Sequence, residues 1–315
     1  MRHNEIVKLR TGLEISRFGL GTATLGGLYT SISDEDAIST VSTALDCGVT
    51  YIDTAPHYGK GSSERRLAKA LAGKTGFHLS TKIGRILIPA INSVDPDFAD
   101  TDTSVVRSFD YSASGVERSI KESLERLEMD HVDIVYIHDP DDEIYIEQSI
   151  KEAYPALEKM RDQGLIKAIG VGMNQSAVPT RFINETDIDM VLIAGRFTLL
   201  DQSAERDLLP AALKRGVDVI AAGVLNSGIL ANPVAGATYD YAPASPAILA
   251  RALTIKEIVT RHGVSLTSAA LQFPLRHPSV KAVLVGCRSS QEVRDNTEAF
   301  DEFIPDAMWH ELARI

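Results

Sequence analysis

The chain has 315 residues, of which 44% are hydrophobic and 24% charged, a composition ordinary for a globular protein and unlike that of a disordered one. Its formal net charge of -11 comes without any cluster of lysine and arginine, which argues against a nucleic-acid surface. The two cysteines, Cys47 and Cys287, lie in unrelated segments without metal-ligand spacing, so we expect a reducing compartment and no zinc. No apolar run has the length of a signal peptide or a membrane span, so we expect a cytoplasmic protein without membrane contact.

Eight short runs of β-branched and other apolar residues predict strands that are buried on both faces, as in a parallel sheet. In chain order they are residues 18–24, 50–54, 77–82, 132–138, 166–173, 190–196, 217–224 and 282–287. Helical patterns lie between these strands. Ser33 with Asp36, and Ser114 with Glu117, have the spacing of capping boxes at helix starts. Behind the second box, apolar residues recur at helical spacing at Val116, Ile120, Leu124 and Leu127.

Three predicted helices end in the same way, with a polar last turn, a glycine and then a strand: Gly48, Gly164 and Gly216 supply the left-handed residue that stops each helix. Strands and helices alternate in this way along the chain without a break in composition. The sequence therefore predicts one α/β domain over residues 1–315, and eight repeats allow its parallel sheet to close into a (β/α)8 TIM barrel.

Two segments fall outside the alternation. Residues 6–14 predict a short N-terminal β-hairpin that turns at Thr11 and Gly12 and closes the bottom of the barrel. Residues 85–111 are too long and too polar for an ordinary strand-to-helix loop, with two prolines and five aspartates. Long loops in compact domains are commonly lids or binding loops, so we expect that role here.

Active sites of such barrels lie at the carboxyl ends of the strands, where this chain carries Asp53, Lys82 and His138, with Tyr58 shortly after the second strand. An Asp and a Lys at adjacent strand ends can pair, and the lysine charge can lower the pKa of a nearby phenol. Tyr58 would then serve as an acid/base, while His138 orients a substrate oxygen. The set suits proton transfer at a carbonyl oxygen coupled to hydride transfer at its carbon, with the hydride handled by a cofactor.

Each of these residues also has a structural interpretation. A buried Asp–Lys pair can hold a barrel together, a histidine at a strand end is often only a satisfied polar residue, and a loop tyrosine usually packs. Taken one at a time, the structural interpretation is the better one. Four such residues at consecutive strand ends favour the functional interpretation.

These residues carry a resemblance to the aldo-keto reductase family over nearly the whole chain. Its most specific element is the Asp-Thr-Ala-x-x-Tyr-Gly sequence at residues 53–59, followed by the later lysine and histidine. Similar stretches occur at residues 19–22, 80–82, 123–127 and 169–172. The resemblance implies a catalytic tetrad of Asp53, Tyr58, Lys82 and His138, in which Tyr58 and His138 contact the substrate. Asp139, with Asp141 and Arg196, would form a polar mouth that suits a polyhydroxylated ligand, although charges at a rim are usually only solvated.

The resemblance also implies a nicotinamide cofactor, held along the ends of the last four strands without the Gly-x-Gly-x-x-Gly sequence of dinucleotide-binding folds. Asn174 would hold the carboxamide, residues 226–228 the pyrophosphate, and residues 285–296 the adenosine. The implied cofactor contacts are Gly21, Thr22, Asp53, Asn174, Asn226, Ser227, Gly228, Arg288, Glu292 and Asn296. Asn226, Ser227 and Gly228 also have the composition of an ordinary turn.

The choice between the two nicotinamide cofactors depends on a few side chains at the adenosine end. Many members that use NADPH carry a basic residue where this chain has Gly286 and Glu292. A carboxylate there would repel a 2′-phosphate and accept a hydrogen bond from a free ribose hydroxyl, which favours NAD. NADP remains the alternative because Arg288 could reach a phosphate. Two positions depart from the family pattern, since the run Ala221-Ala222-Gly223 replaces the usual stacking tyrosine and Ala194 replaces the usual glutamine.

Within the family, residues 109–112, 133–142, 195–202 and 225–230 are similar to a branch of aldose 1-dehydrogenases for L-fucose, L-galactose and other D-threo-aldoses, which includes pyridoxal 4-dehydrogenase. The implied reaction is oxidation of a cyclic hemiacetal to a lactone. Two alternatives are pyridoxal as the substrate and NADPH-dependent aldehyde reduction. A third, from another class, is a non-catalytic redox-sensing subunit, against which the complete tetrad argues. The expected partner is a small sugar or aldehyde, and the sequence leaves monomer and homodimer open.

Overall fold

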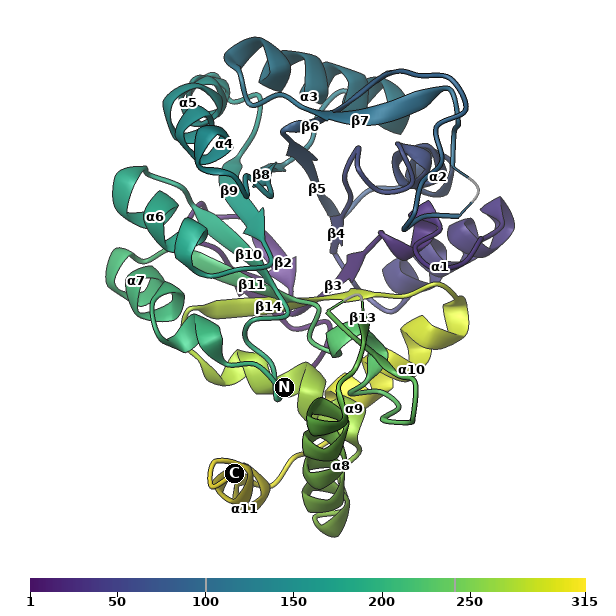
Figure 1. The fold of residues 1–315 in the computed structure, drawn as a ribbon, viewed down its shortest axis with the longest axis vertical. Coiled ribbons are helices and arrows are strands. Elements are labelled where there is room, and N and C mark those ends of the chain that lie inside the picture. The colour runs from purple at the N-terminus through teal and green to yellow at the C-terminus, as the bar shows by residue number, and fades with distance from the viewer. Residues whose placement is uncertain (100, 241) are drawn as a thin grey trace.

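The structure is a computed structural model that describes residues 1–99, 101–240 and 242–315. Eight parallel strands form a closed barrel in which the last strand pairs with the first (Figure 1). Around the barrel the strands are β3 (Phe18–Gly21), β4 (Tyr51–Asp53), β5 (His78–Ile83), β8 (Ile134–His138), β9 (Ala168–Met173), β10 (Met190–Ala194), β11 (Asp218–Ala222) and β14 (Val280–Gly286). The predicted TIM barrel is confirmed.

Helices surround this barrel on the outside (Figure 1). They are α1 (Asp34–Asp46), α2 (Ser62–Leu71), α3 (Ala113–Leu127), α4 (Glu143–Gln148), α5 (Tyr154–Asp162), α6 (Ala177–Glu185), α7 (Leu208–Arg215), α8 (Pro246–Arg261), α9 (Leu266–Gln272), α10 (Ser290–Asp301) and α11 (Asp306–Leu312). Helices α8 and α11 extend away from the ring at the bottom of the view. They belong to a separate apolar cluster that includes Met308 and Trp309.

All eight predicted strands are present, although most are shorter than the apolar runs that predicted them. The run 217–224, for example, contains a strand only from Asp218 to Ala222. Val217 and Val224 are nevertheless buried, with 3% and 1% of their surface exposed. Burial, and not strand pairing, therefore produces the apolar pattern at the strand ends.

One of the two predicted helix starts is confirmed. The hydroxyl of Ser33 accepts a hydrogen bond from the backbone N–H of Asp36 at 3.0 Å. The capping role of Ser114 is wrong, because Ser112 is the N-cap and accepts from Gly115 N–H at 3.0 Å. Asp110 favours Ser112 as the N-cap, since its carboxylate accepts hydrogen bonds from both the backbone N–H and the hydroxyl of Ser112. The three predicted glycine stops are confirmed, each with positive φ.

The N-terminal hairpin is also as predicted, with β1 (Ile6–Lys8) antiparallel to β2 (Glu14–Ser16) and Gly12 at φ +88° in the turn. Leu9, Leu13 and Ile15 from this hairpin pack into the apolar cluster inside the barrel. The amino end of the barrel is therefore filled, and the inward-facing polar side chains lie at the carboxyl end.

Residues 85–111 differ from the expected lid loop. They contain a regular antiparallel hairpin, β6 (Arg85–Pro89) with β7 (Val105–Phe109), whose connecting segment returns to the barrel where Phe98 bridges Leu28. A further two-stranded pair, β12 (Thr238–Tyr239) and β13 (Ala242–Pro243), lies in the connection after β11. Asp100, one of the five aspartates counted in the predicted loop, lies outside the described residues.

Two glycines of the family-like sequences make room for large rings inside the barrel. A Cβ at Gly19 would lie 2.6 Å from the Tyr51 ring, and one at Gly170 would lie 2.5 Å from the Tyr136 ring. Both distances are shorter than packed atoms permit. Glycine at these positions therefore allows two buried tyrosines to stand beneath the strand-end residues.

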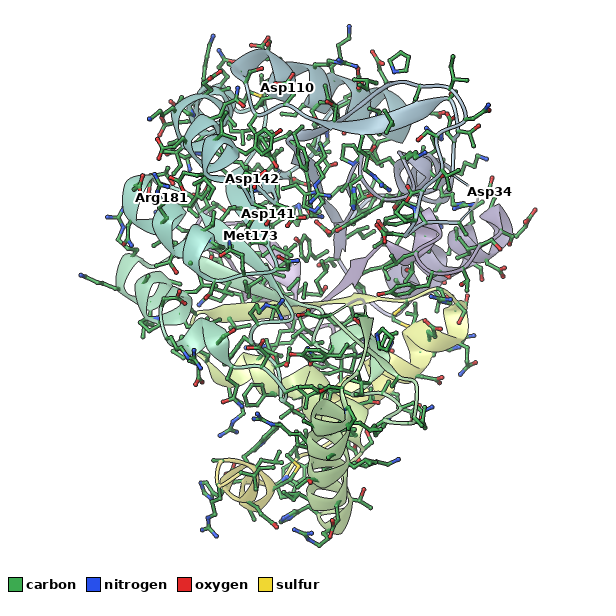
Figure 2. All side chains as sticks on the ribbon, in the orientation of Figure 1. Asp34, Asp110, Asp141, Asp142, Met173 and Arg181 are labelled. Carbon is green, nitrogen blue, oxygen red and sulfur yellow. The ribbon has the colours of Figure 1, made fainter. Side chains whose placement is uncertain are left out.

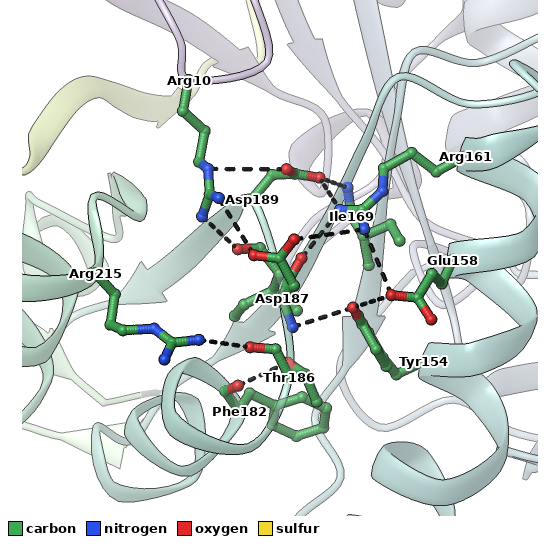
Figure 3. Close-up of polar contacts among 11 residues, drawn as sticks. Arg10, Tyr154, Glu158, Arg161, Ile169, Phe182, Thr186, Asp187, Asp189 and Arg215 are labelled. Carbon is green, nitrogen blue, oxygen red and sulfur yellow. Dashed lines mark hydrogen bonds and ion pairs between the residues drawn. The ribbon is translucent and has the colours of Figure 1, made fainter.

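Carboxylates at the amino end of the barrel bind the backbone of neighbouring strands. Asp189 accepts hydrogen bonds from Ile169 N–H at 2.9 Å and from Arg161 at 2.8 Å, with Asp187 and Arg10 alongside (Figure 3). Asp133 repeats the arrangement, since it accepts from Leu79 N–H at 3.0 Å and from Lys167 at 2.8 Å. These contacts join adjacent strands and are remote from the carboxyl ends, which indicates a role in stability.

Unfolding at low pH tests the stabilising role of Asp133. Burial alone would raise the pKa of its carboxyl, but the His78 ring, the Lys167 ammonium and Leu79 N–H outweigh burial and lower the pKa from 3.8 to about 2. The carboxylate therefore stabilises the fold above pH 3.8, and this contribution is lost as the pH falls toward 2. We expect Asp133→Asn to lower the free energy of unfolding at pH 7 by about 1–3 kcal/mol.

Urea unfolding of wild type and Asp133→Asn between pH 7 and pH 3 measures the effect. The difference between the two proteins should shrink toward pH 3. Asp130→Asn is the matched control, because Asp130 is exposed and should change little. A difference that stays constant over the whole pH range would contradict the assignment.

Candidate active site

Strand register brings the predicted tetrad to one end of the barrel. Asp53 ends β4 and is level with Ser80 on β5, while Lys82 on β5 is level with Tyr136 on β8. His138 ends β8, and Tyr58 follows β4 by five residues. Side chains two apart on a strand point to the same face, so Asp53, Lys82 and His138 all continue the inward-facing rows of their strands.

Asp53 and Lys82 form a fully buried ion pair. The Lys82 ammonium donates to Asp53 Oδ2 at 2.5 Å and to the carbonyl of Thr54 at 2.9 Å. The side chains are 2% and 1% exposed for Lys82 and Asp53, respectively. Burial raises the pKa of Asp53 and lowers the pKa of Lys82, and in each case the charge of the partner opposes the shift. Each charge is therefore tolerated in this interior only because the other is present.

A chain of hydroxyl groups supports this pair from below. Ser80 donates to Asp53 Oδ1 at 2.7 Å, and Tyr51 lies 3.2 Å from Ser80 and 3.0 Å from Tyr136, oxygen to oxygen. Tyr51, Ser80 and Tyr136 each precede a strand-end polar residue by two positions. Sequence reasoning missed these three residues, although the two-residue period of a strand could have found them.

Tyr58 lies close to the Lys82 ammonium group, as the sequence predicted. The Lys82 Nζ is 4.7 Å from the centre of the Tyr58 ring, and the His138 ring centre is 6.1 Å from it. Close backbone packing positions the loop, because a Cβ at Gly59 would lie 2.2 Å from the carbonyl oxygen of Gly26. The structure thus brings all four predicted residues together. Their catalytic roles remain a prediction.

The imidazole of His138 is buried among groups that disfavour its protonated form. Burial, with the positive charges of Arg85 and Lys82 adding to it, lowers the pKa of His138 well below its ordinary value. Its carbonyl accepts a hydrogen bond from the Tyr111 hydroxyl at 2.6 Å, which fixes the end of β8. Its Nδ1 is buried and has no hydrogen-bond partner among the described residues. A neutral ring of this kind can donate to or accept from a substrate oxygen.

Asp139, the other predicted substrate contact, lies directly beside this ring. Its Oδ2 is 3.3 Å from His138 Nε2 and 2.9 Å from the guanidinium of Arg85. Burial raises the pKa of Asp139 to about 6 against the opposing charge of Arg85. In Figure 2, Asp141 and Asp142 mark the segment that continues from this residue, close to Met173 at the end of β9.

Three further residues around Tyr58 were not predicted as site residues. The His57 ring is 6.0 Å from the Tyr58 ring and 5.5 Å from the His138 ring, and Phe98 stacks on Tyr58 at 6.3 Å, all between centroids. Burial, followed by the charge of Arg85, lowers the pKa of His57 to about 2. Phe98 and Arg85 come from the segment that was expected to be a loop, which is why sequence position did not place them here.

The residues expected to contact the cofactor near its nicotinamide differ in whether their hydrogen-bonding groups are already used within the protein. The Thr22 hydroxyl donates to the Asp53 carbonyl at 2.8 Å and accepts from Ser63 at 2.7 Å, so it is occupied within the protein. Gly21 is level with Asp53 in the ladder. Asn174 is exposed just past β9, and its backbone carbonyl accepts a hydrogen bond from Arg196 Nε at 2.6 Å. An amide so placed is available to a ligand.

The segment after β11 has an unusual backbone. Asn226, Ser227 and Gly228 are consecutive residues with φ of +46°, +57° and +97°. Asn226 is buried, and its Oδ1 has no hydrogen-bond partner among the described residues. The backbone N–H groups of Asn226 and Gly228 already donate to the carbonyls of Gly223 and Leu225, at 2.9 and 3.0 Å. The buried Asn226 Oδ1 is therefore the polar atom of this turn that a ligand could complete, and the pyrophosphate contact stays a prediction.

A cavity of about 520 Å³ lies at the adenosine end that the sequence predicted. Helices α1 and α10 both begin at it, and its lining includes Asp36, Arg288 and Glu292. The Arg288 guanidinium is turned toward Thr30 and the Leu28 carbonyl, whereas its backbone N–H donates to Glu292 at 2.9 Å. This lining therefore contains two carboxylates and one guanidinium.

The remaining predicted cofactor contacts have fewer hydrogen-bonding groups available to a ligand. The Asn296 amide donates to the Cys287 sulfur at 3.4 Å, so one of its donors is used within the protein. Ala194 and Ala222 end β10 and β11, and neither strand offers an aromatic ring at that point. The cavity, the exposed amide of Asn174 and the orphaned oxygen of Asn226 are nevertheless donors, acceptors and space of the kind that a nicotinamide dinucleotide requires.

In the described part of the chain, no helix combines the length and the apolar character needed to cross a membrane.

The family model described as "Aldo/keto reductase family" matches residues 17–315. D-threo-aldose 1-dehydrogenase of Pseudomonas sp is 38% identical, with coverage of 99% of this chain and 98% of the relative.

Two other comparisons agree with this match. Pyridoxal 4-dehydrogenase of Microbacterium luteolum is also 38% identical, with coverage of 96% and 94%. The solved structure of an aldo-keto reductase from Bacillus halodurans superposes with a TM-score of 0.79 at 22% identity, covering 98% of this chain and 95% of that one. The chain belongs to the aldo/keto reductase family and is an oxidoreductase.

Proposed function

We propose that this oxidoreductase oxidises the cyclic hemiacetal of an aldose, such as L-fucose, L-galactose or another D-threo-aldose, to its lactone with NAD. The observation that carries the proposal is the Lys82 ammonium at 4.7 Å from the Tyr58 ring, beside the neutral His138. A phenol next to a buried cation can hold negative charge at low cost, which is what a base that removes a hydroxyl proton requires.

Each tetrad residue has one task in this proposal. Tyr58 takes the proton of the anomeric hydroxyl at its phenol oxygen. Lys82 stabilises the phenolate, and Asp53 keeps Lys82 charged and in place through the 2.5 Å contact. His138 binds the same substrate oxygen and orients it. A bound nicotinamide supplies the hydride acceptor, since no side chain can do so.

The adenosine end supports NAD as the cofactor. Glu292, and Asp36 from α1, place two carboxylates in the cavity lining, where they would repel a 2′-phosphate. A ribose 2′-hydroxyl could instead donate to either carboxylate. The guanidinium of Arg288 is engaged with Thr30 and Leu28, which reduces its value as a phosphate ligand. Gly21, Asn174 and Asn226 to Gly228 would hold the rest of the molecule.

The substrate class rests on the relatives and on the polar site. Both relatives at 38% identity are named for compounds that close to cyclic hemiacetals, so pyridoxal is the second candidate. Asp139 beside His138 provides an acceptor for further hydroxyl groups, which favours an aldose. We place the enzyme in the cytoplasm, acting on a free small molecule as a monomer or homodimer, and its two free cysteines fit that compartment.

Removal of the phenol hydroxyl tests the central assignment. Tyr58→Phe should fold, bind NADH with unchanged affinity and lose about 10²- to 10⁴-fold in kcat, because only the proton transfer is removed. Steady-state oxidation of L-fucose, L-galactose, D-arabinose and pyridoxal with NAD measures the loss. Tyr145→Phe is the matched control, since it removes a hydroxyl from a packed ring on α4 outside the tetrad. Substantial activity in Tyr58→Phe would refute the assignment.

Cofactor preference is tested by the charge at Glu292. Glu292→Gln should bind NADPH roughly fivefold more tightly than wild type, since about 1 kcal/mol of repulsion is removed near the surface. NADH affinity should stay the same or weaken. Titrations followed by the fluorescence of the reduced nicotinamide give both constants, and the exposed Glu298 on the same helix, changed to Gln, is the control. A wild-type enzyme that binds NADPH more tightly than NADH would contradict the proposal.

A further inference from the structure

Arg85 begins the β6–β7 hairpin three residues after Lys82, and its guanidinium reaches into the tetrad region. One of its nitrogens lies 2.9 Å from Asp139 Oδ2, and another lies 3.4 Å from His57 Nδ1. The third, Nε, is buried and has no partner among the described residues. The side chain is 18% exposed. Arg85 is thus a partly buried cation with a donor that the protein leaves unused.

The groups next to Arg85 are those that surround the reacting oxygen. Its partner Asp139 contacts His138 Nε2 at 3.3 Å, and the rings of His57 and His138 lie 6.0 and 6.1 Å from the Tyr58 ring. A ligand oxygen held between Tyr58 and His138 would therefore lie near a strong acceptor, Asp139, and a strong donor, Arg85. Hydrogen bonds to charged groups of this kind are the strong ones.

The hairpin that carries Arg85 is fixed to the barrel and does not depend on closure. Arg107, on the partner strand, donates to the His57 carbonyl at 3.2 Å. The buried Lys60 ammonium donates to the carbonyl and hydroxyl of Ser93 and to the carbonyl of Asp102, at 2.9 to 3.1 Å. Arg85 is therefore held in place before any substrate arrives, which lowers the cost of recognition.

We propose that Arg85 and Asp139 form a subsite that binds the hydroxyl group on the carbon adjacent to the reacting carbon. Asp139 accepts from this hydroxyl, and Arg85 donates to it while keeping Asp139 in position. Arg85 is then a specificity-determining residue that separates aldoses from simple aldehydes, which lack the adjacent hydroxyl. The inference rests on the proposed aldose activity and names the part of the sugar that this site recognises.

The test compares a sugar with and without that hydroxyl. We expect wild type to oxidise L-fucose with a kcat/KM about 10- to 100-fold above that for 2-deoxy-L-fucose, as for one hydrogen bond to a charged group. In Arg85→Met the two values should approach each other, through loss on L-fucose and mostly in KM. Asp139→Asn, which keeps the side-chain shape, should reduce the ratio in the same direction.

Two measurements distinguish recognition from general damage. Arg107→Met loosens the same hairpin but leaves the Arg85–Asp139 pair itself, so it should lower kcat/KM for both sugars and reduce their ratio less than Arg85→Met does. Binding of L-fucose to the NADH-loaded enzyme, followed by nicotinamide fluorescence, should weaken in Arg85→Met without any need for turnover.

The possible failures are separable. A wild-type ratio near one, or a ratio that Arg85→Met leaves unchanged, would overturn the subsite while the aldose activity stands. Failure of wild type to oxidise or bind any aldose would overturn the proposed function, and the subsite with it.

Discussion

The arrangement of this barrel depends on one constraint, which is that Asp53 and Lys82 place two opposite charges in an interior that water does not reach. Either charge alone would be costly to bury, because an unpaired buried ion costs several kcal/mol, a large fraction of the stability of a typical domain. The pair therefore fixes how β4 and β5 meet at their carboxyl ends. It also fixes where positive charge faces Tyr58. The ion pair that the fold requires thus also supplies the positive charge on which the proposed reaction depends.

The two ends of the barrel use polar side chains in opposite ways. At the amino end, carboxylates such as Asp133 and Asp189 are saturated by backbone N–H groups and by arginine or lysine, so they join strands and leave little for a ligand. At the carboxyl end, His138 Nδ1, Arg85 Nε and Asn226 Oδ1 are buried without partners among the described residues. Buried polar atoms without partners are costly, and they are expected where a ligand completes the hydrogen bonds.

Substrate choice within the family depends on residues outside the tetrad. Equal identity to an aldose dehydrogenase and to a pyridoxal dehydrogenase shows that overall similarity does not separate the two. The hairpin β6–β7 is a better place to look, since it brings Arg85 to Asp139 and its connecting segment brings Phe98 to Tyr58. A segment that is held rigidly over a reaction centre can change the substrate without changing the chemistry.

By itself, the sequence determined the eight strands, the hairpin plug and the four polar residues at the strand ends. Buried strands and glycine stops leave local patterns, and strand ends of a parallel barrel must converge. Only the tertiary structure decided that Ser112 and not Ser114 caps α3, that Thr22 is occupied, that Phe98 stacks on Tyr58 and that Arg85 pairs with Asp139. Each of these depends on a contact between side chains distant in sequence or on a competing local hydrogen bond, and neither leaves a periodic pattern along the chain.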